Sequence, residues 1–292
     1  MARTRRKAEF GSPVGFKLAL AHVALVLISL VFVLPFLWML STSLKPAGEA
    51  MASPPQWIPS TFQWQNFPEA VAYGSEDLGY IPFLVYGMNT LIITVLCVTG
   101  SVVSNALVGY SFARLNWKGK DLFFSVTIAT MMVPFAVTMV PSFALFKWLG
   151  WVGTFQPLWV PAFFGSAFSI FLLRQFFRTI PMDLSEAAKI DGASEFQIFT
   201  DVILPLAKPA LSVVALFTFM GAWNDFMGPL IYLVDQKSFT LAVGLQAFQS
   251  QHGGTSWNLL MAASLIVIAP IVAVFFFAQK VFLEGIATTG LK

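Results

Sequence analysis

Six apolar segments, each long enough to cross a lipid bilayer as a helix, constrain the fold more than any other feature of this sequence. A hydrocarbon core about 30 Å thick needs about 20 helical residues. The segments are Leu18–Leu44, Pro82–Phe112, Leu122–Phe146, Phe155–Leu173, Ala210–Val234 and Leu259–Ala278. Pro157 and Pro161 interrupt the start of the fourth. We therefore expect an all-α integral membrane protein with six transmembrane helices.

The composition agrees with a protein whose surface is largely in contact with lipid. Of its residues, 57% are hydrophobic and 11% are charged, whereas soluble domains average about 25% charged. The net charge is only +3, and the basic residues lie between apolar segments, so no nucleic-acid partner is expected. The single cysteine, Cys97, cannot form an internal disulfide.

Basic residues are distributed unequally between alternate connections, and this predicts the orientation. All but three of the 17 Lys and Arg residues fall in the two termini or in the second and fourth connections, the exceptions being Lys45, Lys147 and Lys237. The positive-inside rule then places both termini in the cytoplasm. The predicted organisation is a cytoplasmic tail (1–17), a first helix with an external loop (18–81), a core of five helices (82–281) and a second cytoplasmic tail (282–292).

The connection between the fourth and fifth helices, residues 174–209, carries signals for two short helices. Asp183 or Ser185 can cap the first helix, and Gly192 suits the left-handed residue that ends it. Ser194 and Gln197 form a capping-box pattern for the second helix. One face of that helix is apolar, with Phe196, Phe199 and Ile203. Such a helix–turn–helix either docks in a groove of a soluble partner or lies on the bilayer surface.

The same connection contains Glu186-Ala187-Ala188-x-x-Asp191-Gly192-Ala193, followed by Phe199 and Leu204-Pro205-Leu206-x-x-Pro209. This pattern resembles the EAA loop of binding-protein-dependent ABC importer permeases. In that family the loop is a coupling helix that sits in a cleft of the cytoplasmic ATPase. The resemblance implies ATPase coupling by Glu186, Ala187, Ala188, Asp191, Gly192 and Ala193.

Three further segments resemble the carbohydrate permeases of this family. Ala222-Trp223-Asn224-Asp225-Phe226 with Pro229 is similar to their fifth-span signature, and Ser41-x-Ser43-Leu44-Lys45-Pro46 is similar to the start of their first external loop. The segment from Phe277 to Gly285 resembles the carboxy terminus of the maltose-type second permease, which has six spans. The ending Thr288-Thr289-Gly290-Leu291-Lys292 departs from the usual Gly-Ala-Val-Lys-Gly. Contacts of the tail with the ATPase are expected from Gly290, Leu291 and Lys292.

The resemblance implies a type I ABC importer permease fold with its coupling helix between spans four and five. It also implies translocation of a carbohydrate, most naturally an oligosaccharide, across the inner membrane of a bacterium or archaeon by alternating access. The implied partners are a second homologous permease, two ATPase subunits that bind ATP and Mg, and an external or periplasmic solute-binding protein. This chain has no phosphate-binding loop and no close group of metal ligands. We therefore expect a non-enzymatic subunit without cofactor or metal.

Asp225 is the only carboxylate inside a predicted span, so it is expected to face protein or a watery cavity. It either lines the translocation path, with Trp223 stacking on sugar and Asn224 bonding to it, or belongs to a structural network that fixes a helix break at Gly228-Pro229. Asn89 is a further candidate for the path, or bridges helices. A second class of function is a proton- or sodium-coupled carrier that uses Asp225, but this leaves the capped hairpin without a role.

Overall fold

The computed structural model describes residues 13–249 and 254–289, and every regular element in this part of the chain is helical. The chain divides into two compact units. The first unit contains residues 1–70 and 250–265, and the second contains residues 71–249 and 266–292. The all-α prediction is confirmed, and the two units are described in turn.

In the first unit a single asparagine organises the loop that follows the first helix. Helix α1 (Pro13–Ser43) is followed by the short η1 (Ala47–Glu49) and α2 (Asn66–Ala72). The Nδ2 of Asn66 donates to the carbonyl oxygens of Ser43 (2.8 Å) and Lys45 (2.9 Å), while its Oδ1 accepts from Nδ2 of Asn258 (3.1 Å). These bonds satisfy backbone groups that α1 leaves unpaired at its end.

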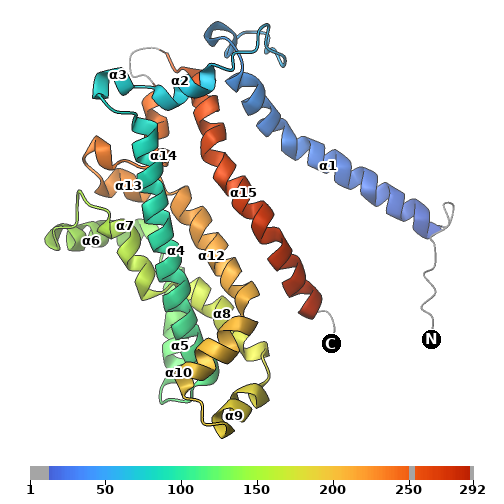
Figure 1. Cartoon of the computed structure of the whole chain (residues 1–292), viewed down its shortest axis with the longest axis vertical. Coiled ribbons are helices and arrows are strands. Elements are labelled where there is room, and N and C mark those ends of the chain that lie inside the picture. The colour runs from blue at the N-terminus through green and yellow to red at the C-terminus, as the bar shows by residue number, and fades with distance from the viewer. Residues whose placement is uncertain (1–12, 250–253, 290–292) are drawn as a thin grey trace. The chain divides into compact units, whose positions relative to one another are not determined.

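Helix α4 (Pro82–Arg114) is the central element of the second unit (Figure 1). It packs against α8 (Ala167–Thr179), α12 (Lys208–Trp223) and η3 (Val160–Phe164). Small residues allow the close approach, because a β-carbon at Gly109 would lie 3.1 Å from Cβ of Leu173 on α8. Asn105 also joins the helices, since its Oδ1 accepts from the amide of Ser166 at 2.7 Å.

Four stretches are long and apolar enough to span a membrane, and two bent pairs raise the total to six. The four stretches are Phe16–Ser43, Pro82–Arg114, Gln156–Thr179 and Trp257–Gln279. The stretch Gln156–Thr179 consists of α7 (Gln156–Trp159), η3 and α8. The second bent pair joins Glu195–Leu206 to Lys208–Trp223 at 79°, so it combines part of the connection 174–209 with the start of the fifth predicted segment. All six predicted apolar segments are mostly helical, but the third, fourth and fifth are interrupted.

The third predicted span, Leu122–Phe146, is sharply bent. Helix α5 (Lys120–Ala129) and η2 (Thr130–Met132) meet α6 (Phe135–Trp148) at 101°. The bend falls at Val133-Pro134, where proline lacks a donor N–H and forces the preceding residue into an extended conformation. The third predicted span is therefore a pair of helical pieces joined at a proline, and not one continuous helix.

The fifth predicted span, Ala210–Val234, is also interrupted. Helix α12 ends at Trp223, and α13 covers Met227–Tyr232. Asn224, Asp225 and Phe226 form the break, whereas Gly228 and Pro229 lie inside α13. The break was thus predicted too far along the chain. Asp225, the residue before the N-cap Phe226, accepts from the amide of Gly228 in the first turn of α13 at 3.1 Å.

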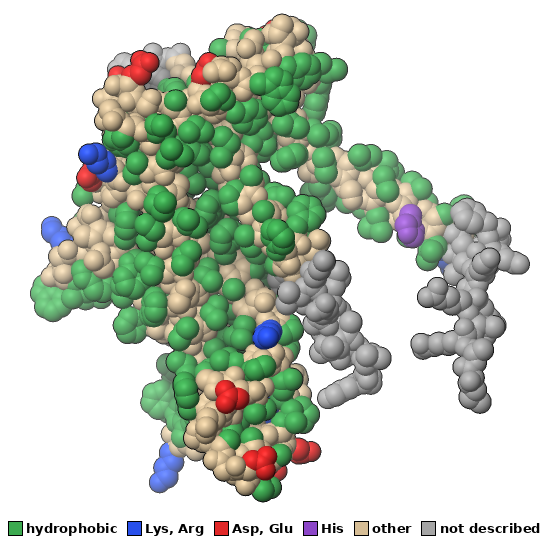
Figure 2. Space-filling model, viewed as in Figure 1, with side chains coloured by type: hydrophobic (Ala, Val, Ile, Leu, Met, Phe, Trp, Pro, Cys, Tyr) green, Lys and Arg blue, Asp and Glu red, His purple; other side chains and the backbone are tan. Residues whose placement is uncertain are grey.

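Helix α15 (Trp257–Thr289) extends beyond the predicted Leu259–Ala278 and passes residue 282, where the cytoplasmic tail was expected to begin. The tail residues Gly290, Leu291 and Lys292 lie outside the described residues. The short elements of the second unit are α3 (Ser75–Leu78), η5 (Gln236–Ser238), α14 (Leu241–Gly244) and η6 (Leu245–Phe248). Hydrophobic side chains cover most of the face of the second unit seen in Figure 2.

Candidate functional site

The hairpin at residues 182–206 occupies one end of the second unit (Figure 1). Its first helix, α9 (Met182–Ile190), begins directly after Pro181, which takes the N-cap position without a side-chain hydrogen bond. Asp183 instead lies in the first turn, and Ser185 is buried with no partner for its Oγ. The predicted cap by Asp183 or Ser185 was therefore wrong, because the rigid φ of proline starts the helix earlier.

The turn of the hairpin has the predicted left-handed glycine. Gly192 has φ +86°. Its amide donates to the carbonyl of Lys189 at 3.0 Å, and the amide of Ala193 donates to the carbonyl of Ala188 at 2.9 Å. This pair of bonds is the Schellman arrangement, which satisfies the last carbonyls of a helix. A residue with a β-carbon is strained at such a φ.

The second helix of the hairpin begins with the predicted capping box. Oγ of Ser194 accepts from the amide of Gln197 (3.3 Å), and Oε1 of Gln197 accepts from the amide of Ser194 (2.9 Å). A single turn, α10 (Glu195–Gln197), is followed by the π-helix η4 (Ile198–Ile203) and by α11 (Leu204–Leu206).

The π-helix changes which side chains face inward. Phe199 and Ile203 are buried, but Phe196 is 67% exposed. A π-helix bonds residues five apart, so it does not keep the spacing of an α-helical face. The prediction that all three lie on one apolar face was therefore wrong for Phe196.

The residues of the EAA-like motif are mostly on the surface of the hairpin. Glu186, Ala187, Asp191 and Gly192 are exposed, while Ala188 and Ala193 pack partly against the core. Beside them, the side chain of Ile190 is 86% exposed. The hairpin therefore presents exposed acidic groups together with Ile190 and Phe196, and Figure 2 shows acidic side chains gathered at this end.

Two residues of α4 that the sequence did not single out hold the hairpin in place. The hydroxyl of Tyr110 donates to Oε2 of Glu195 at 2.9 Å. The guanidinium of Arg114 donates to the carbonyl of Ile180 (2.6 Å) and to Sδ of Met182 (2.7 Å). Arg114 was counted only as an orientation signal, yet it is buried.

Glu195 also forms an ion pair with Lys189 on the first helix, with 2.5 Å between Nζ and Oε1. The bond from Lys189, and then that from Tyr110, hold the pKa of Glu195 below its ordinary value of 4.5. Both side chains of the pair are about half exposed, so the pair adds little stability by itself.

An apolar cluster lies beneath the hairpin and joins it to α4, α8 and α12. Its buried members are Ala106, Tyr110, Leu173, Phe177, Ile180, Ile198, Phe199, Ile203, Ala207, Ala210 and Val214. The rings of Tyr110 and Phe199 are 5.0 Å apart. The hairpin is thus packed as part of the second unit.

The break between α12 and α13 forms the other candidate site. Oδ1 of Asp225 accepts from the amide of Gly228 at 3.1 Å. Asp225 lines two cavities of about 280 and 500 Å³. The smaller is also lined by Thr90, Ile93, Cys97, Leu158, Ala162, Thr218, Gly221, Ala222, Pro229 and Thr240. The larger is also lined by Phe135, Thr138, Ser142, Phe146, Pro157, Leu158, Pro161, Met227, Gly228 and Tyr232.

The other path candidates are engaged elsewhere. Trp223 is 7% exposed, and its Nε1 donates to the carbonyl of Val267 at 3.0 Å. Nδ2 of Asn224 donates to the carbonyl of Met220 (2.8 Å). Nδ2 of Asn89 donates to the carbonyls of Lys237 (2.8 Å) and Phe239 (2.9 Å). Of the four candidates, only Asp225 lines the two cavities.

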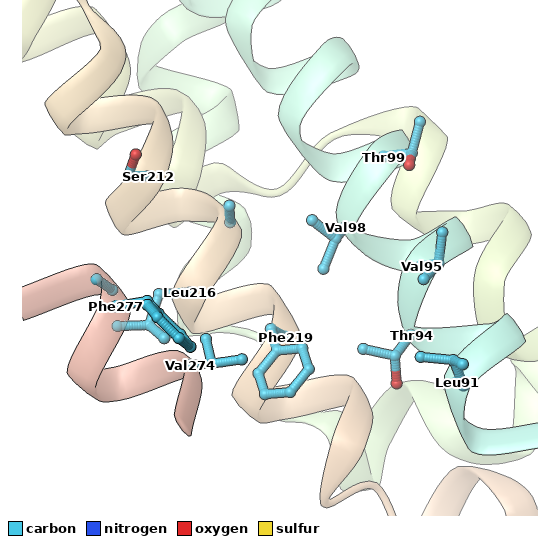
Figure 3. A pocket seen from close by; sticks show the side chains of 12 residues that line it. Leu91, Thr94, Val95, Val98, Thr99, Ser212, Leu216, Phe219, Val274 and Phe277 are labelled. Carbon is cyan, nitrogen blue, oxygen red and sulfur yellow. The ribbon is translucent and has the colours of Figure 1, made fainter. Parts of the chain in front are cut away.

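A third cavity, of about 500 Å³, lies between α4, α12 and α15 (Figure 3). Apart from Thr94, Thr99 and Ser212, its lining is apolar, with residues such as Leu91, Val95, Leu216, Phe219 and Phe277. This lining suits hydrocarbon better than a hydroxylated solute. Within residues 13–249 and 254–289, no three His, Cys, Asp or Glu side chains are placed to hold a metal ion.

Residues 105–287 match the family described as binding-protein-dependent transport system inner membrane component. The chain belongs to this family. It is 31% identical to the arabinooligosaccharides transport system permease protein AraQ of Halalkalibacterium halodurans, over 94% of this chain and 96% of that protein. It is 32% identical to the trehalose/maltose transport system permease protein MalG of Thermococcus litoralis, over 94% and 97%. The chain is thus a transport permease of the ABC importer type, and nothing in these likenesses supports a secondary carrier.

The fold agrees with this family. A chain of a bacterial ABC transporter involved in the import of the acidic polysaccharide alginate superposes with a TM-score of 0.79, over 92% of this chain and 98% of that one. The two chains are 22% identical, so the likeness concerns the fold. The predicted importer permease fold is confirmed.

Proposed function

We propose that this chain is one of two permease subunits of an ATP-driven importer that carries a neutral oligosaccharide across the inner membrane. The family match and the relatives named for oligosaccharide transport support this proposal. Two ATPase subunits, which bind ATP and Mg, supply the energy, and an external solute-binding protein delivers the sugar. Both termini lie on the cytoplasmic side, as the distribution of basic residues indicates.

The hairpin docks on the ATPase, and its exposed surface is the observation that carries the proposal. Ile190 and Phe196 project from a hairpin that is otherwise tightly bonded to the second unit. Exposed apolar side chains of this kind fit a groove on a partner. The alternative, a hairpin lying on anionic lipid, is disfavoured because five of the six charged residues between 182 and 206 are acidic. The tail residues Gly290, Leu291 and Lys292 add contacts to the same partner.

The sugar passes close to Asp225 at the interface between the two permeases. Asp225 lines two cavities, and the larger combines this carboxylate with Phe146, Tyr232 and the hydroxyls of Thr138 and Ser142. Carboxylate, hydroxyl and aromatic groups suit a neutral, hydroxyl-rich ring. No Lys or Arg lines either cavity, so an anionic sugar would meet the negative charge of Asp225 without compensation. Trp223, Asn224 and Asn89 act beside this path by fixing its walls.

The experiment is co-purification of ATP-binding subunits with the tagged chain from membranes of its source cell. Ile190→Asp and Phe196→Asp should each lower the amount of ATPase recovered by about tenfold, since a buried apolar contact is worth about 1.5–3 kcal/mol. Ile58→Asp is the matched control, because Ile58 is also exposed but lies outside the hairpin. Wild-type recovery in both hairpin variants would contradict docking.

Uptake by the wild-type complex in proteoliposomes tests the transport proposal separately. Labelled maltose and arabinotriose should accumulate when ATP is enclosed, and a proton uncoupler should leave accumulation unchanged. Accumulation that requires the proton gradient and not ATP would overturn the importer proposal.

A further inference from the structure

Tyr110 and Arg114 lie one helical turn apart on α4 and therefore point to the same side. Arg114 contacts the start of the hairpin, through the carbonyl of Ile180 and Sδ of Met182. Tyr110 contacts its return segment, through Glu195. The last turn of α4 thus holds both arms of the hairpin at once.

Bonds within the hairpin join its two arms to each other. Its two arms are joined by the turn at Gly192 and by the ion pair between Lys189 and Glu195. The capping box of Ser194 and Gln197 fixes the start of the return arm. A force applied to the exposed surface at Ile190 therefore reaches Glu195 and the start of α9 together.

The burial of the Arg114 side chain costs desolvation free energy that its contacts do not fully offset. Its side chain is 8% exposed, its Nε has no hydrogen-bond partner, and no carboxylate pairs with it among the described residues. A buried cation without an opposite charge is unfavourable. The carbonyl of Ile180 and the sulfur of Met182 offset the desolvation of this cation only weakly. Their bonds to Arg114 nevertheless fix the position of the hairpin relative to α4.

Tyr110 is held just as closely. Its ring packs 5.0 Å from that of Phe199 and 6.5 Å from that of Phe177. These neighbours leave the phenol directed at Glu195. The aromatic contacts and the hydroxyl bond together connect α4 to the π-helical arm.

The same helix reaches the cavity that Asp225 lines, because Thr90, Ile93 and Cys97 of α4 form part of its wall. We propose that Tyr110 and Arg114 are the positioning residues through which displacement of the hairpin by an ATPase moves α4, and with it this cavity. The inference rests on the proposed docking of the hairpin. Under this proposal, two residues outside the EAA-like motif transmit the movement of the hairpin to α4.

The test is amide hydrogen exchange on the complete importer in nanodiscs, with and without the non-hydrolysable ATP analogue AMP-PNP and Mg²⁺. Two segments are followed, the hairpin (182–203) and the end of α4 (108–114). In the wild type the nucleotide should change exchange in both. In Tyr110→Phe and Arg114→Lys the hairpin should still respond, but the nucleotide-dependent change at 108–114 should fall by about fivefold, the effect of losing one net hydrogen bond.

A purely structural role would alter exchange at 108–114 equally with and without nucleotide, so the difference separates the two roles. Tyr73→Phe and Arg178→Lys are matched controls. Among the described residues, neither the Tyr73 nor the Arg178 side chain forms a hydrogen bond or ion pair with the hairpin. An undiminished response at 108–114 in both test variants would overturn the inference. A wild-type hairpin that ignores the nucleotide would instead contradict the proposed docking. If Tyr110→Phe fails to assemble, Glu195→Ala, which removes the acceptor of the Tyr110 hydroxyl, replaces it under the same criterion. If Arg114→Lys fails to assemble, Met182→Leu, which removes one of the two acceptors of Arg114, replaces it in the same way.

Discussion

The amide of Gly228 donates to Oδ1 of Asp225, and the absence of a side chain at Gly228 leaves room for the other oxygen of that carboxylate. A β-carbon at position 228 would collide with Oδ2 of Asp225 and lie 3.0 Å from Cδ2 of Leu158. The carboxylate can therefore bond to the first turn of α13 and line both cavities only because residue 228 is glycine.

We predict that Gly228→Ala strongly reduces uptake while the importer still assembles. The added methyl group displaces the carboxylate of Asp225 or Leu158, and such overpacking costs about 1–3 kcal/mol. Gly87→Ala in α4 is the control, because its β-carbon would meet no atom within 4 Å. Uptake in proteoliposomes and co-purification of the ATPase are the measurements. Normal uptake by Gly228→Ala would remove Asp225 from the path.

Replacement of Asp225 separates a polar role from a charged one. Asp225→Asn keeps an oxygen that can accept from the amide of Gly228, so we expect it to retain part of the uptake. Asp225→Leu leaves that amide without its partner, which costs about 1–3 kcal/mol, and should abolish uptake or assembly. Initial uptake rates of a neutral sugar, normalised to complex in the membrane, give the comparison. Equal rates in both variants would show that the carboxamide and carboxylate contacts are irrelevant.

Glu195 predicts a specific pH dependence for the hairpin. Its pKa is lowered in the folded state because Lys189 and Tyr110 bond to the charged form. Its stabilising contribution is therefore complete above the ordinary value of 4.5, and is lost as the pH falls through the lower folded-state value. Titration of the labelled carboxyl carbon by NMR, with Glu195→Gln to assign the signal, should give a midpoint below 4.5. A midpoint above that value would contradict the bonded geometry.

Asn66 should be a strong determinant of stability in the first unit. Asn66→Ala leaves the carbonyls of Ser43 and Lys45 and the amide of Asn258 without their buried partner. Since each orphaned group costs about 1–3 kcal/mol, the midpoint of thermal unfolding in detergent should fall clearly. Gln65→Ala, at the exposed neighbouring position, should leave it unchanged. An unaltered midpoint in Asn66→Ala would mean that water replaces these bonds.

Local signals made the apolar spans, the turn of the hairpin and the cap of its second helix predictable from the sequence. The left-handed turn at Gly192 and the box of Ser194 and Gln197 depend on residues within a few positions of each other, so the chain shows them directly. Contacts between distant residues leave no such pattern. Tyr110 and Glu195 are 85 positions apart in the sequence. Arg114 has the sequence signature of a surface charge, and its bond to the carbonyl of Ile180 is visible only in the structure.

The size and exact position of the bends could not be predicted for a related reason. Hydropathy reports that a segment prefers lipid, and it is the same for a straight helix and for the 101° bend before Phe135. Proline at 134 indicated a bend without fixing its angle, because neighbouring helices decide how the freed carbonyls are satisfied. The π-helix from Ile198 to Ile203 was likewise not predicted, and three of its side chains are buried in the apolar cluster under the hairpin.

The last prediction concerns Gly192, where conformation and crowding can be separated. A β-carbon there would meet no atom within 4 Å, so any effect of substitution within this chain comes from φ +86°. The strain is about 1–2 kcal/mol for an ordinary residue, and asparagine tolerates the left-handed region better than alanine or valine. Recovery of the ATPase and uptake should therefore decline in the order Gly192→Asn, Gly192→Ala, Gly192→Val, with membrane insertion unchanged. Equal, undiminished coupling in all three would show that the reversal at this turn does not position the hairpin for its partner.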